Sequence, residues 1–285
     1  MSVTRLSIMT AVALVAFAGN SVLCRVALKG ELIDANLFTA VRIISGALAW
    51  FSFYLFQNKA KQLMHSGTLA GGLSLAIYMV SFSWAYLDLD TGVGALILFG
   101  LVQITMVVWS IARGELPSKL QVSGLTLALI GLAWLLLVPG VGAPALSAGL
   151  MMATSGVAWG AYTLLGQAST DPVRDTAGNF LRASPVALLI IIVSLDSLVW
   201  SSAGLVWAVM SGVLASATGY AIWYMVLREL SATRAAGLQL VVPVLASFGG
   251  LLFASEQLTG RLLSASALIL GGVALVLKKK RVASR

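Results

Sequence analysis

The chain has 285 residues, of which 59% are hydrophobic and 10% charged, and its mean hydropathy is +0.98. A soluble domain carries about 25% charged residues, so a soluble fold of this size could not bury so much apolar surface. The formal net charge of +8 would suggest nucleic acid binding in a soluble chain, but here most of the excess lies in short links between apolar segments and at the C-terminal end. We therefore expect an all-α membrane protein with the lipid bilayer, and no nucleic acid, as its partner.

Apolar segments follow one another along the whole chain. A hydrocarbon core of about 30 Å requires about 20 apolar residues per helix, and continuous apolar runs exclude a barrel, whose strands alternate. The segment after Arg5 lacks a convincing signal peptide and is expected to be retained as the first span. The ten predicted spans are Leu6–Leu28, Asn36–Phe56, Gly67–Leu87, Thr91–Ala112, Leu120–Pro139, Ser147–Ala168, Thr176–Leu195, Ala203–Met225, Ala235–Ala254 and Leu262–Leu277.

The basic residues are unevenly divided between the two ends of these spans. With a cytoplasmic N-terminus, the outer links carry only Lys29 and Arg261. The thirteen on the inner side are Arg5, Lys59, Lys61, Arg113, Lys119, Arg174, Arg228, Arg234, Lys278, Lys279, Lys280, Arg281 and Arg285. Cytoplasmic links carry an excess of Lys and Arg, so we expect a multi-pass protein of the inner (plasma) membrane with both termini in the cytoplasm.

The chain contains an internal repeat. Four matches share an offset of about 140 residues, namely Phe17–Asn20 with Trp159–Tyr162, Arg42 with Arg182, Gly114–Leu116 with Ser255–Gln257, and Ile130-Gly131 with Gly271-Gly272. We predict two five-helix units, 1–139 and 147–277, followed by a basic cytoplasmic tail, 278–285. Because five is an odd number, the second unit would enter the membrane from the opposite side. Such inverted repeats are typical of secondary transporters, whose substrate site lies at the interface near the midplane.

The residues of this repeat resemble the EamA-type branch of the drug/metabolite transporter superfamily. Trp159-Gly160, Arg42 and the stretch Ser231–Ala246 with Glu256-Gln257-Leu258 carry the resemblance, although Phe17-Ala18 replaces the usual Trp-Gly. The overall run is also similar to the YddG-type aromatic amino acid exporters. The resemblance implies a ten-helix carrier with a central cavity that exports small metabolites, most of all aromatic and other apolar amino acids, by alternating access.

Polar and aromatic residues inside the spans are candidates for the substrate site, because exposing them to lipid is costly. The predicted substrate-binding residues are Asn20, Tyr78, Gln103, Trp159, Tyr162 and Gln239. The competing interpretation is that these amides and rings only hold helices together. Gln239 lies one turn before Pro243, which lacks an N–H, so we expect the helix to open there. Arg42 and Arg182 are expected to reach the headgroups with their long side chains rather than bind a substrate carboxylate.

The positions of the charged and nucleophilic residues argue against proton coupling, metal binding and catalysis. All ten acidic residues and His65 fall in links or at span ends, so we expect facilitated diffusion or exchange rather than obligatory proton coupling. Cys24, the only cysteine, cannot build a thiolate zinc site. We expect no catalytic residue, metal or cofactor. Export of another amphipathic metabolite or a cationic drug, a channel or structural partner, and a membrane-embedded enzyme remain as alternatives.

Overall fold

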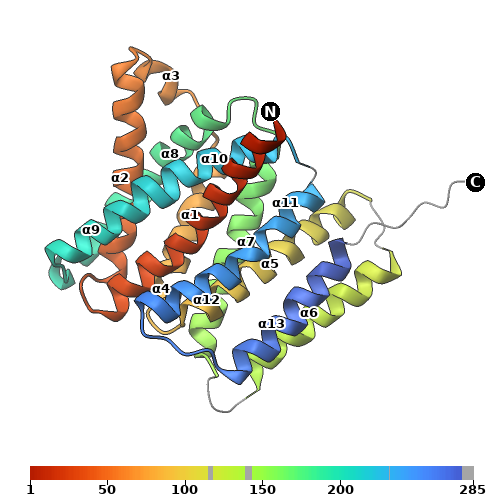
Figure 1. The fold of residues 1–285 in the computed structure, drawn as a ribbon. Coiled ribbons are helices and arrows are strands. Elements are labelled where there is room, and N and C mark those ends of the chain that lie inside the picture. Colours follow the sequence, from red (N-terminus) through yellow and green to blue (C-terminus); the bar gives the residue numbers. More distant parts are fainter. Residues whose placement is uncertain (115–117, 139–142, 231, 278–285) are drawn as a thin grey trace, which may run out of the picture.

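The computed structural model describes residues 1–114, 118–138, 143–230 and 232–277, without the side chains of residues 232–234, 236 and 277, and this part of the chain is built from helices (Figure 1). The α-helices are α1 (Val3–Lys29), α2 (Ala35–Phe56), α3 (Ala60–Met64), α4 (Leu69–Ala85), α5 (Thr91–Ala112), α6 (Lys119–Leu137), α7 (Leu146–Gln167), α8 (Pro172–Ser194), α9 (Ser202–Met210), α10 (Gly219–Leu227), α11 (Ala232–Gln239), α12 (Val241–Phe253) and α13 (Gly260–Leu277). A short 3₁₀ turn, η1 (Leu195–Ser197), follows α8, and a π-helical segment, η2 (Ser211–Thr218), joins α9 to α10. The all-α prediction is confirmed for these residues.

Several helices begin where the sequence supplies a side chain to cap them. Asp34 accepts a hydrogen bond from the Leu37 N–H at 2.9 Å, and Thr68 accepts one from the Gly71 N–H at 2.9 Å. Ser118 and Gln121 form a capping box at the start of α6. Such caps satisfy N–H groups that the first turn of a helix leaves unpaired. The capped residues therefore fix the starts of the helices at the polar links.

Six helices in the described part of the chain are long and apolar enough to cross a membrane. They are Val3–Lys29, Ala35–Phe56, Thr91–Ala112, Lys119–Leu137, Pro172–Ser197 and Ser202–Leu227, with shorter apolar helices at Leu69–Ala85, Gly237–Phe253 and Gly260–Val276. Each predicted span coincides with one helix or with consecutive helical segments, and the span predicted at Thr91–Ala112 has the bounds of α5. The chain is therefore a multi-pass membrane protein, while ten crossings stay a prediction.

Proline 243 interrupts the helical path between α11 and α12, as the sequence predicts. Pro243 has no N–H to donate to the carbonyl of Gln239, four residues earlier, and α11 ends at Gln239. The two helices meet at Leu240. Pro185, by contrast, lies inside α8, which continues through it. The short helix α3 in the polar link after α2 is an element that the hydropathy pattern does not predict.

Several helices of the first predicted unit pack against their counterparts in the second. α6 packs along α13, α2 along α8, and α5 along α12 (Figure 1). The first and third helices of the two units exchange partners instead, since α4 packs against α7 and α1 packs against α10. The core of buried side chains lies where α1, α4, α5, α7 and α10 meet.

The molecule has two polar ends. At the first, which we call the Met1 end, the N-terminal amine of Met1 lies 3.3 Å from a Glu229 carboxylate oxygen, and Arg228 donates to the carbonyl of Thr170 just after α7. At the other, which we call the Arg25 end because Arg25 lies in the last turns of α1, the Ser201 hydroxyl before α9 donates to the carbonyl of Leu32 after α1 at 2.9 Å. α1 thus runs away from the Met1 end and α7 runs towards it. The predicted basic tail, 278–285, lies outside the described residues, and so do residues 139–142 at the link between the two predicted units.

The α6–α13 contact depends on two glycines that face each other. A Cβ added to Gly272 would overlap the carbonyl oxygen of Gly124, whereas one added to Gly271 would meet nothing within 4 Å. Gly272→Leu is therefore expected to lower the free energy of unfolding by about 3 kcal/mol, because backbone atoms cannot move aside as a side chain can. Gly271→Leu, one position earlier, should change it little. Thermal unfolding in detergent compares the two, and equal midpoints would contradict the packing.

Candidate functional site

A cluster of aromatic rings lies at the centre of the core, and Trp159 of α7 is its middle member. The Trp159 ring centroid lies 4.6 Å from that of Tyr220 on α10 and 5.0 Å from that of Tyr78 on α4. Phe17 of α1 contacts it edge-on at 5.3 Å, and Tyr162 stacks on it at 5.4 Å. All five side chains are buried. Rings from four helices therefore converge on one point.

Arg42 of α2 reaches this cluster and is fully buried. Its Nη2 donates to the Tyr220 hydroxyl at 2.6 Å and to the Tyr78 hydroxyl at 3.1 Å, and its Nε donates to the Ser216 hydroxyl at 2.9 Å. The expectation that Arg42 reaches the headgroups is wrong, because its side chain has 0% exposure and turns inward to these hydroxyl groups. No carboxylate among the described residues pairs with it.

Arg182, which answers Arg42 in the repeat, lies in a different environment. Its Nη1 donates to the carbonyl of Ser66, in the link before α4, and to that of Gly178 at 3.3 Å. The side chain is half-buried. The two arginines therefore differ in role although the repeat aligns them, and only Arg42 faces the ring cluster.

Asn20 ties the cluster to the π-helical segment η2. Its Nδ2 donates to the Tyr220 hydroxyl at 3.1 Å, and its Oδ1 accepts from Ser211 at 2.7 Å and from Ser216 at 3.2 Å. π-Helical turns occur frequently at functional sites. Here the segment brings two serine hydroxyls onto the face that meets Asn20 and Arg42. A continuous polar network thus links α1, α2, α4, η2 and α10.

The structure brings five of the six predicted site residues into contact, directly or through Tyr220. Asn20 and Tyr78 both bond the Tyr220 hydroxyl, Tyr78 and Tyr162 both contact Trp159, and the Trp159 indole N–H donates to Gln239 Oε1 at 3.2 Å. The sixth, Gln103, is buried on α5 one turn beyond Phe99, whose ring stacks on Phe17 at 6.3 Å.

Tyr220 and Arg42 are the central residues that the sequence prediction missed. The repeat offers a signal for the first, since Tyr220 follows Tyr78 by 142 residues, the offset that also relates Phe17 to Trp159. Applying that offset to Tyr78 identifies Tyr220. For Arg42 the repeat gives no such guide, because its equivalent, Arg182, points elsewhere; the signal in the sequence is that Arg42 is one of the residues that carry the family resemblance.

Several buried polar atoms around the cluster have no hydrogen-bond partner among the described residues. They are Arg42 Nη1, Tyr162 Oη, Gln239 Nε2 and Trp223 Nε1. Leaving a buried donor unpaired costs about 1–3 kcal/mol, and more for a charged group. All four can donate, so an acceptor such as a carboxylate complements them. The space among the neighbouring rings is only about 10 Å³, about the space that one water molecule needs, so it is too small for a larger molecule in this structure.

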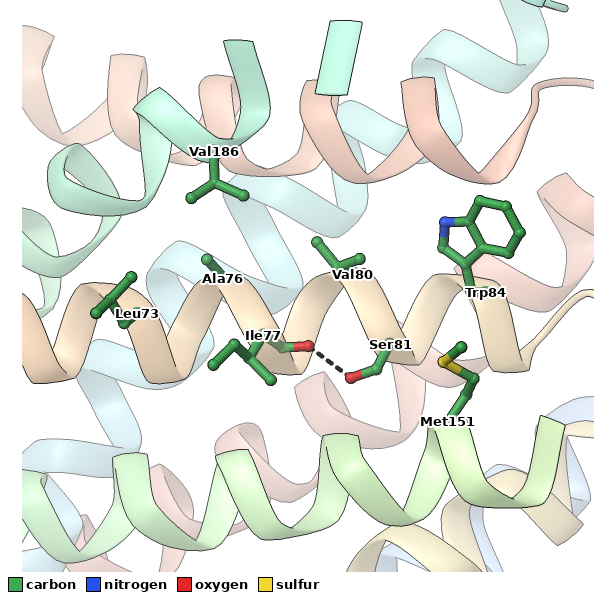
Figure 2. Close-up of a pocket in the computed structure, with 8 residues that line it drawn as sticks. All are labelled: Leu73, Ala76, Ile77, Val80, Ser81, Trp84, Met151 and Val186. Carbon is green, nitrogen blue, oxygen red and sulfur yellow. Dashed lines mark hydrogen bonds between the residues drawn. The ribbon is translucent and has the colours of Figure 1, made fainter. Parts of the chain in front are cut away.

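The larger hollows of the molecule lie away from this cluster. One of about 420 Å³ is bounded by α4, α7 and α8 and is almost entirely apolar (Figure 2). Its polar side chain, Ser81, donates to the carbonyl of Ile77 in its own helix at 2.5 Å. Ile77 and Trp84 are exposed there. This hollow is an apolar groove on the side of the molecule, and a lipid chain would cover it in a bilayer.

A second groove, of about 870 Å³, lies between α4, α5 and α7. Trp109 and Val108 line it and are exposed, and Arg113, whose guanidinium lies over the Trp109 ring at 5.0 Å, stands at its Met1 end. Thr105 separates it from the α7 backbone next to Trp159, because it packs against Gly160. Neither groove contains the convergent donors of the central cluster.

Comparison with known proteins identifies the family. The EamA-like transporter family matches residues 146–278. The uncharacterized protein PA1977 of Pseudomonas aeruginosa is 46% identical over 273 residues, covering 96% of this chain and 94% of that protein. The uncharacterized transporter YoaV of Bacillus subtilis is 23% identical over 249 residues, covering 83% of this chain and 85% of that one.

The fold is also found in a solved crystal structure. That structure aligns with a TM-score of 0.69 at 17% identity, over 95% of this chain and 97% of the other. The structural alignment extends over both predicted units, whereas the family match covers the second unit. The chain belongs to the EamA-like transporter family and is a multi-pass membrane transporter.

Proposed function

We propose that the protein exports aromatic and other apolar amino acids across the inner membrane, in the manner of the YddG-type exporters. The observation that carries the proposal is Arg42, whose guanidinium is fully buried, has no carboxylate partner among the described residues, and keeps one nitrogen without a hydrogen bond. A buried charge is stable only when it is paired. The carboxylate of an amino acid would supply the missing partner at the ring cluster.

The neighbouring side chains suit the rest of such a molecule. Trp159, Tyr78 and Tyr162 offer faces and edges against which an apolar or aromatic side chain can pack. Gln239 and Asn20 add amide groups, and Gln103 lies buried nearby on α5. A mostly apolar pocket with a few convergent polar groups is typical of small-molecule sites. The six residues predicted from the sequence therefore remain our proposed substrate-binding set, with Arg42 and Tyr220 added.

The charge of the site argues against one alternative substrate. A cationic drug would bring a second positive charge next to Arg42, and like charges at short range in a low-dielectric interior repel strongly. Another amphipathic metabolite that carries a carboxylate fits the same donors. A membrane-embedded enzyme would need an activated nucleophile or a general base at the centre, and the described residues around the rings supply tyrosines, amides and an arginine instead.

Alternating access between two inverted five-helix units, 1–139 and 147–277, is our proposed mechanism. The opposite directions of α1 and α7 support it, as does the packing in matched pairs, such as α2 with α8 and α5 with α12. The central space of about 10 Å³ is closed to solutes. Relative movement of the two units would open it to one side of the membrane and then to the other.

The flux assay that tests the proposed function is phenylalanine counterflow in proteoliposomes with equal pH on both sides. Wild-type protein is expected to exchange labelled for unlabelled phenylalanine without a proton gradient. Gln239→Ala and Trp159→Ala should each slow exchange by about tenfold or more, because each removes one side of the Trp159–Gln239 hydrogen bond and part of the proposed pocket. Normal flux in both folded variants would mean that these residues only pack helices.

Both termini are proposed to lie in the cytoplasm, because of the thirteen-to-two division of Lys and Arg along the sequence. Single cysteines at Ser2 and Ser284, in a chain whose Cys24 is replaced by alanine, should resist an impermeant thiol reagent in intact cells and react after lysis. Modification of either cysteine without lysis would reverse the proposed topology.

A further inference from the structure

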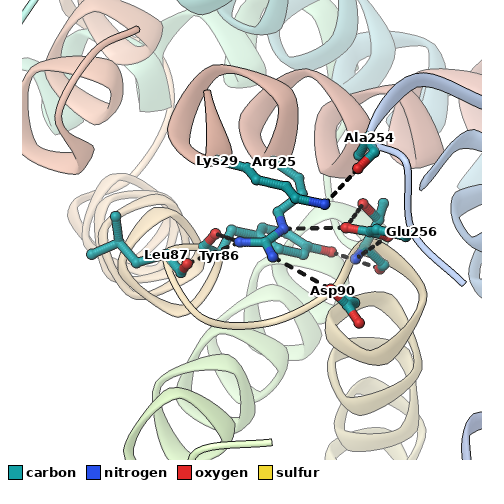
Figure 3. Close-up of polar contacts among 8 residues, drawn as sticks. Arg25, Lys29, Tyr86, Leu87, Asp90, Ala254 and Glu256 are labelled. Carbon is teal, nitrogen blue, oxygen red and sulfur yellow. Dashed lines mark hydrogen bonds and ion pairs between the residues drawn. The ribbon is translucent and has the colours of Figure 1, made fainter. Parts of the chain in front are cut away.

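A second charge cluster, built around the buried side chains of Arg25 and Glu256, lies at the Arg25 end of the molecule (Figure 3). The Arg25 side chain is 9% exposed and that of Glu256 is 6% exposed, and Arg25 Nε lies 3.1 Å from Glu256 Oε1. Arg25 Nη2 lies 3.3 Å from Asp90 Oδ1, while Lys29 Nζ donates to the carbonyl of Ala254 at 2.6 Å. These contacts fasten the end of α1 to the segment that follows α12.

The carboxylate of Glu256 is held by groups that would bind any carboxylate. Its Oε2 accepts from the backbone N–H of Thr91 at 2.8 Å, and its Oε1 accepts from the Thr91 hydroxyl at 3.0 Å as well as from Arg25. Thr91 is the first residue of α5, a helix of 22 residues, and N–H groups at a helix start favour an anion. Arg25 and the start of α5 thus form a seat for a carboxylate, which we call the Arg25–Thr91 seat.

One face of α4, continued by the C-cap residue Tyr86, connects this seat with the central cluster. Tyr78, Phe82 and Tyr86 follow one another at four-residue intervals, with ring centroids 5.4 and 4.7 Å apart. The Arg42 guanidinium carbon lies 4.9 Å from the Phe82 ring centroid, and Arg25 Nη1 donates to the carbonyl of Tyr86 at 3.0 Å. The two buried guanidinium groups therefore stand at either end of one short helix face.

We propose that the Arg25–Thr91 seat is a second carboxylate site on the substrate path, occupied by Glu256 while this end of the carrier is closed. A carboxylate that leaves Arg42 and reaches the seat takes the place of Glu256. Because Glu256 joins the segment after α12 to α1 and α5, its displacement releases that segment and opens the Arg25 end. The identity of the arriving carboxylate, that of an amino acid, rests on the proposed function, whereas the seat itself does not.

The native Cys24 provides a probe for the test. It is the only cysteine in the chain, precedes Arg25 on α1, and has 0% exposure. In Glu256→Ala protein, the rate of Cys24 modification by a maleimide is expected to rise by about tenfold or more, since the charge-assisted hydrogen bonds that close this end are lost. Added sodium acetate should fill the vacant seat and slow the modification again. Sodium chloride at the same concentration should leave it fast.

A second variant checks that acetate acts at the seat. In Arg25→Gln/Glu256→Ala protein, Cys24 should react fast whether acetate is present or not. If Glu256→Ala does not fold, Glu256→Gln keeps the size of the side chain and should likewise raise the modification rate. An unchanged rate in the folded variant, or equal effects of acetate and chloride in Glu256→Ala, would overturn the proposal. Acetate protection in a protein that fails to exchange phenylalanine would instead refute the proposed substrate alone.

Discussion

Phenylalanine exchange is expected to fall by about thirtyfold or more when Arg42 is replaced by glutamine. Removing one partner of a buried, hydrogen-bonded charge pair costs about 2–5 kcal/mol, and each 1.4 kcal/mol is about tenfold in affinity. Glutamine retains hydrogen-bonding atoms near Tyr78 and Tyr220 but has no charge to offer a carboxylate. Arg42→Lys should also be strongly impaired, because an ammonium group cannot bond three hydroxyls as the guanidinium does and still face a carboxylate.

Arg182→Gln is the matched control for this prediction. It removes the same charge from the equivalent position of the repeat, but its guanidinium bonds the carbonyl of Ser66 in a link. Its phenylalanine exchange, measured per amount of folded protein, should stay within about threefold of the wild-type rate. The loss of one charge-assisted hydrogen bond to the substrate would slow exchange by about tenfold or more. Full exchange by folded Arg42→Gln protein would remove Arg42 from the substrate site, and equal losses in both variants would indicate a general effect of charge removal.

The second large effect is expected on stability at the Arg25 end. Arg25→Gln should lower the free energy of unfolding by about 3–5 kcal/mol, because it leaves the Glu256 carboxylate buried without its charged partner. Arg25→Gln/Glu256→Gln should recover much of that loss, since neither charge then remains in the interior. Reversible denaturation or thermal midpoints in detergent, measured for both single variants and the double variant, give the coupling energy.

An exposed ion pair in the same chain serves as the comparison. Arg174 Nε lies 3.4 Å from Asp171 Oδ2, and the two side chains are 40% and 43% exposed. Such pairs contribute about 0–1 kcal/mol, so Arg174→Gln should shift the midpoint little. A double variant at Arg25 and Glu256 that loses the sum of the two single losses would show that the buried pair is not coupled.

The positions of the helices followed from the sequence because hydropathy and turn chemistry are local properties. The bounds of α5 agree with prediction, and the interruption at Leu240 follows from the missing N–H of Pro243. The π-helical segment η2 did not follow, because nothing in the pattern of Ser211–Thr218 differs from an ordinary apolar helix. Its serines bond Asn20 and Arg42, which lie far away in the sequence.

The candidate site was predictable only as far as burial follows from residue type. Their residue types predict that amides and rings inside the spans face the protein interior, and Asn20, Tyr78 and Trp159 do so. The direction of a long side chain depends on its neighbours instead. Arg42 could reach either the headgroups or the core, and the hydroxyls of Tyr78 and Tyr220 decide for the core. The direction of the Arg42 side chain therefore depends on which helices pack together, and this cannot be read from the residues around Arg42 in the sequence.

Competition in the phenylalanine counterflow assay tests the central claim most directly, namely that Arg42 binds the carboxylate of the substrate. Unlabelled phenylalanine and 3-phenylpropionate, which both carry a carboxylate, should compete with labelled phenylalanine for wild-type protein. Phenylalaninamide keeps the ring and the amine but has no carboxylate, and it should compete at least about tenfold less well. Competition by phenylalaninamide equal to that by phenylalanine would contradict a carboxylate site at Arg42.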